Sequence, residues 1–148
     1  MRFTKSVLFF LVIIFSGCSK EQLLESRLQG TWKIDIYTKT IYQDNTPLLS
    51  ESSSFSDVGT FEFKSNGKGS YNLVKDLGYG AYSGYGEFTW TNTASSVTIY
   101  QTGSNKIFQV VTNSSNRIEL EHIVENFYLP GHSSEFHYSL DEFISLVK

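Results

Sequence analysis

The side chains of this 148-residue chain that could perform chemistry are few, and three histidines come first. His122, His132 and His137 lie near the carboxyl end. A zinc site needs three or four converging ligands, and the spacing of these histidines matches no zinc motif. His122 shares the strand parity of Ile118 and Leu120, which favours a hydrogen-bonded histidine in the core or at its rim. We therefore expect no metal ion and no cofactor.

The candidate catalytic groups are equally sparse. Glu119 and Glu121 have outward parity on one predicted strand, and Glu125 follows in a loop. Two carboxylates can act as an acid and a base, but side chains that face water are more typical of a solvated strand. The chain has no GxSxG motif, and its GYGAYSGYG run lacks the lysine of a phosphate-binding loop. These observations argue against an enzyme.

The GYGAYSGYG run at residues 78–86 allows two interpretations. Tyr79, Tyr82 and Tyr85 could expose rings that stack on a sugar or on another protein. Alternatively, the glycines relieve crowding in a bulged, strongly bent strand. We favour the second interpretation, because sheet curvature alone accounts for the glycines.

The amino end has the pattern of a secretory signal. Residues 1–17 contain Arg2 and Lys5, then an apolar run over residues 7–15, then the small pair Ser16 and Gly17. The run is shorter than the roughly 20 residues of a membrane-spanning helix. Removal of residues 1–17 would leave 10 basic and 15 acidic side chains, a net charge of -5. Such a chain offers no basic surface for nucleic acid or anionic lipid headgroups.

Cys18 is the single cysteine, so an exported domain could form no internal disulfide with it. The run FSGC resembles the lipobox of bacterial lipoproteins, with Phe15 where that motif most often has leucine. The resemblance implies that Cys18 is acylated and anchors the chain to a membrane. Ser19 after the cysteine resembles lipoproteins of the outer membrane of Gram-negative bacteria, which is the location we expect.

The composition favours strands over helices. Ser and Thr number 33, Tyr nine and Phe 12, whereas Ala numbers two. One short helix is expected over residues 21–29, because leucines at helical spacing end at Gly30. Residues 43–58 read as a long loop. Alternating apolar residues then mark a hairpin over residues 61–74, followed by four strands that begin near residues 87, 97, 106 and 117, as in an antiparallel sandwich or barrel.

The carboxyl end is ambiguous. Phe136, Tyr138 and Leu140 could alternate in a last strand. Ser139 and Glu142, however, form the pattern of a capping box, and apolar residues follow at helical spacing from Leu140 to Val147. We expect a terminal helix packed on the sheet.

A family resemblance follows from three segments. LQGTWKI, with Gly30 and Trp32, looks like the GxW signature that opens lipocalins. FEFKSNGKGSY and FTWTNTASSVTIY look like the lipocalin-like domains of bacterial lipoproteins, notably those of Bacteroidota. The resemblance implies an all-β, antiparallel up-and-down barrel of about eight strands. Gly30 and Trp32 would be structural at its closed end, Arg117 would be the available arginine to cover the tryptophan, and residues 43–58 would form a lid.

The predicted organisation is a signal peptide over residues 1–17, a lipidated tether with a short helix over residues 18–27, and a lipocalin-like barrel over residues 28–148. The residues with inward parity are Trp32, Ile34, Ile36, Phe61, Phe63, Tyr71, Leu73, Phe88, Trp90, Val97, Ile99, Phe108, Val110, Ile118 and Leu120. Seven of these 15 are aromatic, so any cavity should be narrow and near the mouth.

No lysine or arginine shares the inward parity, so the interior should suit a small apolar ligand that is flat or slender. We expect Trp90, Tyr71 and Phe88, with the lid residues Leu49 and Phe55, to line the cavity. The alternative is a filled barrel that acts through its surface as an interaction or structural lipoprotein.

Overall fold

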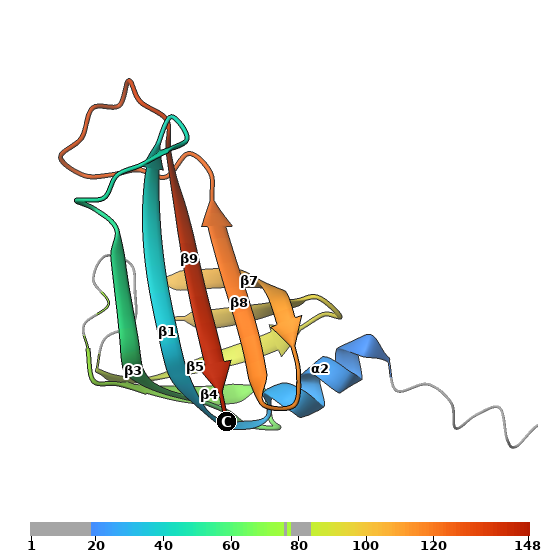
Figure 1. Cartoon of the computed structure of the whole chain (residues 1–148). Helices are drawn as coiled ribbons and strands as arrows, with labels where there is room; N and C mark the ends of the chain where they lie inside the picture. Colours follow the sequence, from blue (N-terminus) through green and yellow to red (C-terminus); the bar gives the residue numbers. More distant parts are fainter. Residues whose placement is uncertain (1–18, 76, 78–83) are drawn as a thin grey trace, which may run out of the picture.

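The computed structural model describes residues 19–75, 77 and 84–148, and it is mostly β-structure with one short helix (Figure 1). The helix is α2 (Lys20–Leu28). The strands within the described residues are β1 (Gly30–Gln43), β2 (Thr46–Pro47), β3 (Ser53–Phe63), β4 (Lys68–Leu73), β5 (Tyr85–Asn92), β6 (Ser96–Gln101), β7 (Ser104–Asn113), β8 (Arg117–Val124) and β9 (Tyr138–Val147).

The strands form an up-and-down antiparallel barrel. Each strand from β3 to β9 pairs with its neighbour along the chain, and β1 pairs with both β3 and β9, which closes the sheet. The two-residue strand β2 lies outside this ring, on the end of β1. The predicted eight-stranded barrel is therefore confirmed.

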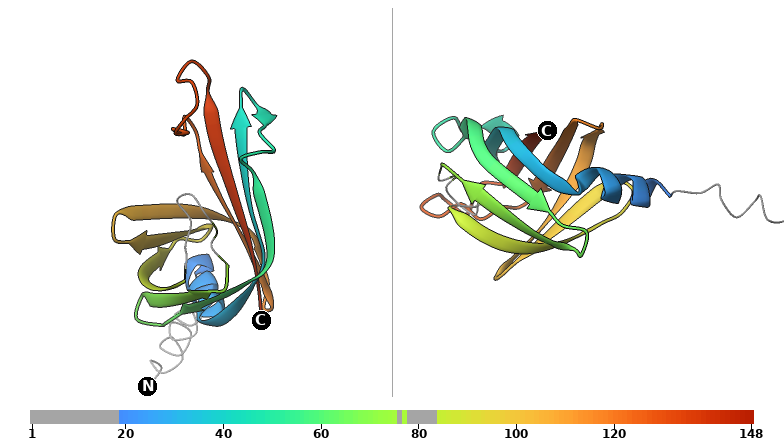
Figure 2. Two further views of the ribbon diagram at one scale, coloured as in Figure 1. Left: turned by 90° about the vertical axis from the view of Figure 1, so that its left-hand side faces the viewer. Right: turned by 90° about the horizontal axis from the view of Figure 1, so that it is seen from below.

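The barrel has two zones of different construction. Strands β1, β3, β8 and β9 stand side by side as a tall wall, in which β1 and β9 reach highest, and strands β4 to β7 wrap around the lower part (Figures 1 and 2). The larger apolar cluster fills the lower barrel, and a second cluster lies at the top. We call the upper zone, residues 41–52 and 124–140, the crest.

The helix α2 closes the bottom of the barrel. Ser19 caps it in a capping box with Gln22, and Gly30 follows the helix with a φ of 111°, a conformation that favours glycine. Leu24 and Leu28 are fully buried against the barrel. The predicted short helix is confirmed. Of the described residues, none belongs to a helix long and apolar enough to cross a membrane.

Trp32 lies between this helix and the barrel core. Its side chain is fully buried, and its indole N–H donates to the carbonyl of Leu28 at 2.6 Å. The ammonium of Lys148 lies 4.4 Å from the ring centroid, so a lysine covers the tryptophan. The expectation for Arg117 is wrong, because Arg117 lies on the outside of the barrel, 3.6 Å from Asp35.

Aromatic rings fill the lower barrel. Phe61 packs edge to face against Phe63, Tyr71 and Phe88 at centroid distances of 6.0, 6.3 and 5.7 Å. Phe63 packs in the same way against Trp90 at 5.4 Å. Edge-to-face rings with such separations leave little space between them.

A β-bulge in β1 changes which residues face inward. The register shifts between Ile34 and Ile36, and Ile36 is 38% exposed. The extra residue inverts the alternation, so Tyr37, Lys39 and Ile41 are buried. The prediction that Ile36 faces inward is therefore wrong, since strict alternation cannot include a bulge.

The carboxyl end is strand β9, so the expected terminal helix is wrong. β9 pairs along its whole length with β1, and its segment Leu140–Val147 pairs with β8. Closing the barrel requires a strand between these two partners. Those backbone hydrogen bonds outweigh the local helical spacing and the capping-box pattern.

The expected loop over residues 43–58 is mostly strand. Asp44 and Asn45 form a tight turn with φ values of 48° and 65°, β2 follows, and β3 begins at Ser53. The serine-rich composition concealed the start of β3, because serine is typical of loops. A lid of 16 residues is therefore absent from this segment.

Candidate functional site

The crest is built around a small apolar cluster of its own. Its buried members are Ile41, Leu129, Tyr138 and Leu140, and Leu48, Val124 and Phe127 pack against them. Backbone hydrogen bonds fix the chain there. The amide of Phe127 donates to Tyr138 at 2.7 Å, and that of Asp44 donates to His137 at 2.9 Å. One bond thus joins the two ends of the loop between β8 and β9, and the other joins the carboxyl end of that loop to the turn after β1.

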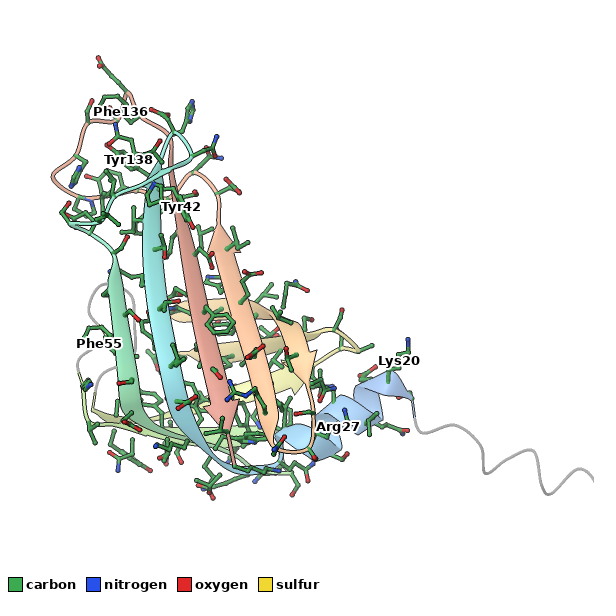
Figure 3. All side chains as sticks on the ribbon, in the orientation of Figure 1. Lys20, Arg27, Tyr42, Phe55, Phe136 and Tyr138 are labelled. Carbon is green, nitrogen blue, oxygen red and sulfur yellow. The ribbon has the colours of Figure 1, made fainter. Side chains whose placement is uncertain are left out.

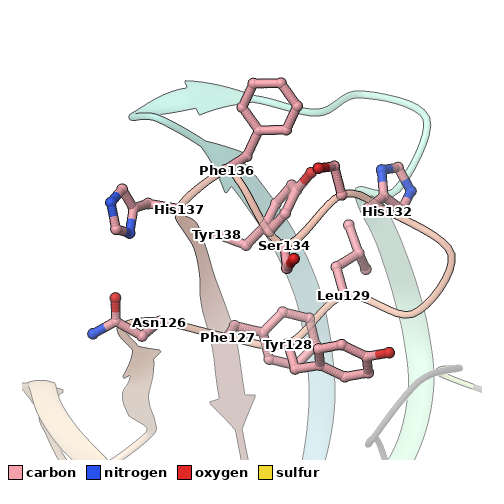
Figure 4. Close-up of a pocket in the computed structure, with 10 residues that line it drawn as sticks. Asn126, Phe127, Tyr128, Leu129, His132, Ser134, Phe136, His137 and Tyr138 are labelled. Carbon is pink, nitrogen blue, oxygen red and sulfur yellow. The ribbon is translucent and has the colours of Figure 1, made fainter.

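That loop contains a hollow of about 230 Å³, which we call the crest cleft (Figure 4). It is lined by Asn126, Phe127, Tyr128, Leu129, His132, Ser133, Ser134, Phe136, His137 and Tyr138. Phe136 and Tyr138 pack edge to face at 6.4 Å, and His132 lies 5.8 Å from Tyr138. Four aromatic side chains and two histidines therefore surround one small volume.

The polar side chains that line the crest cleft, apart from its two tyrosines, are an amide, two hydroxyls and two imidazoles. Among the described residues that line it there is no aspartate, glutamate, lysine or arginine. Ser133 accepts a hydrogen bond from the amide of Glu135. His132 Nε2 lies 3.6 Å from a carboxylate oxygen of Glu51, just outside the cleft. The lining thus offers amide, hydroxyl and imidazole groups beside the rings.

A second hollow, of about 330 Å³, adjoins the crest cleft. Asn126, His137 and Tyr138 line both hollows. The other lining residues of the second hollow are Asp44, Asn45, Glu125 and Ser139. We call the two hollows together the crest groove, which has an aromatic half and an acidic half.

A buried charged layer separates the crest from the aromatic core. Glu142 of β9 is 1% exposed and accepts a hydrogen bond from the Tyr37 hydroxyl at 2.7 Å. Lys106 Nζ lies 2.8 and 2.6 Å from its two carboxylate oxygens. Lys39, 8% exposed, faces Glu142 in the β1–β9 register. The expectation that no lysine faces inward is wrong, because the bulge turns Lys39 inward and Lys106 shares the parity of Phe108.

His122 borders this layer. It stands opposite Glu142 in the β8–β9 register and packs against Phe108, with ring centroids 5.4 Å apart. Its Nδ1 lies 2.8 Å from the carbonyl oxygen of Ile107. His122 is therefore hydrogen-bonded, as predicted for a histidine in the core or at its rim, and it lies at the rim.

Asp141, next to Glu142 in the chain, has surroundings that disfavour its ionised carboxylate. Its Oδ1 is buried without a hydrogen-bond partner in the described part of the chain. Burial raises the pKa of Asp141, and the nearby carboxylates of Glu121 and Glu142 raise it further. The native state therefore binds this proton more tightly than the unfolded state. The residue favours folding at low pH, and that contribution is lost as the pH rises through its folded pKa.

The residues predicted to line a cavity lie apart from the crest cleft. Phe88 and Trp90 are each 4% exposed within the aromatic core, and Tyr71 and Phe55 pack against that core. Leu49 is 83% exposed. None of the five lines the crest cleft, and their contact with a ligand stays a prediction.

Other sequence candidates also find a place. Tyr79 and Tyr82 lie outside the described residues, and Tyr85 is 70% exposed. A side chain at Gly86 would collide with the Tyr71 ring, so glycine is needed there for packing.

Glu119 accepts a hydrogen bond from Thr112 on the outer face. Across residues 19–75, 77 and 84–148, no three His, Cys, Asp or Glu side chains gather into a possible metal site.

The crest cleft was missed by the sequence reasoning. Residues 125–138 look like a connecting loop, whereas the regular alternation of apolar residues points to the barrel interior. A usable signal was present, since Phe127, Tyr128 and Phe136 stand in a segment otherwise rich in small and polar residues. Exposed aromatic residues in a loop indicate a binding function more than a structural one.

Comparison with known proteins places the chain in a family. Residues 28–120, more than half of the chain, match the lipocalin-like domain family. Among solved structures, a redesigned beta barrel is similar at 16% identity and a TM-score of 0.37, covering 84% of this chain and 94% of that one. No curated protein matches the sequence. The match over residues 28–120 shows that the chain belongs to the lipocalin-like domain family.

Proposed function

We propose that this protein is a lipid-anchored lipoprotein of the cell envelope that binds a small ligand with an apolar face in the crest cleft. The observation that carries the proposal is a preformed hollow walled by four aromatic side chains, at the end of the lipocalin-like barrel opposite α2. The lower barrel is filled by its own rings, which favours the crest over the interior as the site.

The proposed anchor is consistent with the position of the cleft. Cys18 precedes the helix cap Ser19, and α2 starts at Lys20. Two residues span at most about 7 Å, so an acyl group on Cys18 would lie close to the start of the helix. An acyl chain on Cys18 would hold the barrel floor against the bilayer. Lys20 and Arg27 lie on α2 at one end of the molecule, and Phe136 and Tyr138 lie at the other (Figure 3). The cleft would then face away from the membrane.

The anchor can be tested by metabolic labelling. Cells that express the full chain and are grown with labelled palmitate should incorporate label in the wild type and lose all of it with Cys18→Ala. Ser19→Ala is the matched control and should keep the label, because acylation needs the thiol. Equal labelling of the wild type and Cys18→Ala would refute the anchor.

Ligand binding can be tested with the neutral apolar dye N-phenyl-1-naphthylamine. Both core clusters lie within residues 24–146, so the test uses residues 18–148 with Cys18→Ser to prevent acylation. The dye should brighten on binding, and Phe136→Ala should weaken binding about three- to tenfold through loss of one ring contact. Tyr100→Ala is the control, since Tyr100 on β6 is 40% exposed and Phe136 is 44% exposed. Equal affinity of both variants for the dye would exclude the crest cleft as its site.

The filled barrel supports a second candidate, a lipoprotein that acts through its surface on another macromolecule. Its supporting observation is the edge-to-face packing of Phe61, Phe63 and Phe88 inside the lower barrel. Absence of any dye binding by the wild type would favour this candidate. We propose a binding protein in either case and not an enzyme.

A further inference from the structure

We propose that the natural ligand of the crest groove is a neutral saccharide. This inference rests on the proposed function, because it specifies the ligand of the same site. Three properties of the groove support a saccharide ligand. Its aromatic rings are exposed, its polar side chains can form hydrogen bonds with hydroxyl groups, and its charged residues are all acidic.

The rings are available to a ligand. Tyr128 is 75% exposed and Phe136 is 44% exposed at the wall of the crest cleft. Figure 4 shows two stretches of chain at the loop between β8 and β9, with Phe127 and Tyr128 on one and Phe136 and Tyr138 on the other. A sugar ring presents a flat face of C–H groups, and aromatic rings bind such a face while the hydroxyl groups stay at the edge.

The polar groups of the groove can both donate and accept hydrogen bonds. In the described part of the chain, the side chains of Asn126, Ser134 and His137 make no hydrogen bond. A carboxamide, a hydroxyl and an imidazole each provide a donor and an acceptor when neutral. A saccharide hydroxyl can pair with both kinds of group, whereas a purely apolar ligand that covered them would displace their water and replace none of its hydrogen bonds.

The charges of the groove disfavour other ligand classes. Asp44 and Glu125 line its acidic half, and among its described lining residues no lysine or arginine occurs. Carboxylates accept hydrogen bonds from hydroxyl groups but repel fatty acids and phosphates. A quaternary ammonium binds aromatic rings by cation–π contact, and acidic groups among the rings strengthen such a site. Here Asp44 and Glu125 lie in the half away from Tyr128 and Phe136, and Glu51, just outside the cleft, lies 3.6 Å from His132.

The test measures saccharide binding by saturation-transfer NMR and calorimetry, with residues 18–148 carrying Cys18→Ser. The probes are maltose, cellobiose and lactose, with tetramethylammonium and octanoate as charged comparisons. At least one disaccharide should bind, and Tyr128→Ala should weaken it about five- to tenfold. Tyr85→Ala is the matched control, because Tyr85 is a similarly exposed tyrosine on β5 and should leave binding unchanged.

A second variant separates the saccharide from a merely apolar ligand. Asn126→Asp keeps a residue type that tolerates the φ of 54° at this position but removes the amide donor. It should weaken the disaccharide several-fold and weaken N-phenyl-1-naphthylamine less, because the dye has no hydroxyl group to accept a hydrogen bond from the Asn126 amide.

The results of these experiments separate the saccharide proposal from the proposed function of ligand binding in the crest cleft. Dye binding in the cleft without binding of any of the three disaccharides would overturn the saccharide and leave the proposed function standing. Binding of tetramethylammonium or octanoate in place of the disaccharides would overturn it in favour of a charged ligand. Absence of binding by the dye and all these probes would overturn both proposals.

Discussion

Replacing Trp32 with alanine should lower the free energy of unfolding by about 3–5 kcal/mol, as expected for truncation of a fully buried aromatic side chain. The indole fills the space between α2 and the barrel, and its N–H bonds to Leu28. Truncation leaves a cavity at the floor and an unpaired carbonyl on Leu28. Urea unfolding followed by circular dichroism measures this loss.

Lys148→Ala provides the control for the Trp32 variant. It removes the cation over the same ring but keeps the ring buried, so it should cost no more than about 1 kcal/mol. If Trp32→Ala unfolded at the same urea concentration as the wild type, Trp32 would not close the barrel floor.

Replacing Glu142 with leucine should destabilise the protein by a comparable amount, about 3–5 kcal/mol. Glu142 is 1% exposed, and the side chain of Lys106 is 11% exposed. The substitution leaves the lysine ammonium buried without its carboxylate and also removes the partner of the Tyr37 hydroxyl. Lys106→Met should be destabilising for the converse reason.

The double variant Lys106→Met with Glu142→Leu separates charge from packing. Its loss of stability should be smaller than the sum of the single losses, because neither charge is then left alone. The four proteins form a double-mutant cycle, measured by urea unfolding at one pH. Additive losses would show that Lys106 and Glu142 do not interact across the barrel.

The strands of the lower barrel could be predicted from the sequence because their alternation is regular. Phe61 and Phe63, or Phe88 and Trp90, alternate with polar residues and are buried as the pattern indicates. Period-two alternation reports the side of the sheet directly. The short helix was equally visible, from its leucine spacing and Gly30.

The bulge in β1, the strand β9 and the crest could not be predicted, because each depends on contacts between residues that are far apart in the chain. The bulge near Ile36 inverts the rest of β1, and no residue type marks it. The helical spacing around Leu140 was outweighed by pairing with β1 and β8 on both sides. The crest cleft exists only because the loop before β9 is tied to Asp44 and packs on Leu48.

NMR chemical-shift mapping tests most directly whether a ligand binds at the crest and not inside the barrel. The chain has two tryptophans, so the indole N–H signals of Trp32 and Trp90 report on the interior. On titration of ¹⁵N-labelled protein with N-phenyl-1-naphthylamine, we expect shifts confined to the amides of residues 44–51 and 126–138. Both indole signals should stay in place. Movement of the Trp90 indole signal together with the amides of Tyr71 and Phe88, with the crest unchanged, would contradict the account.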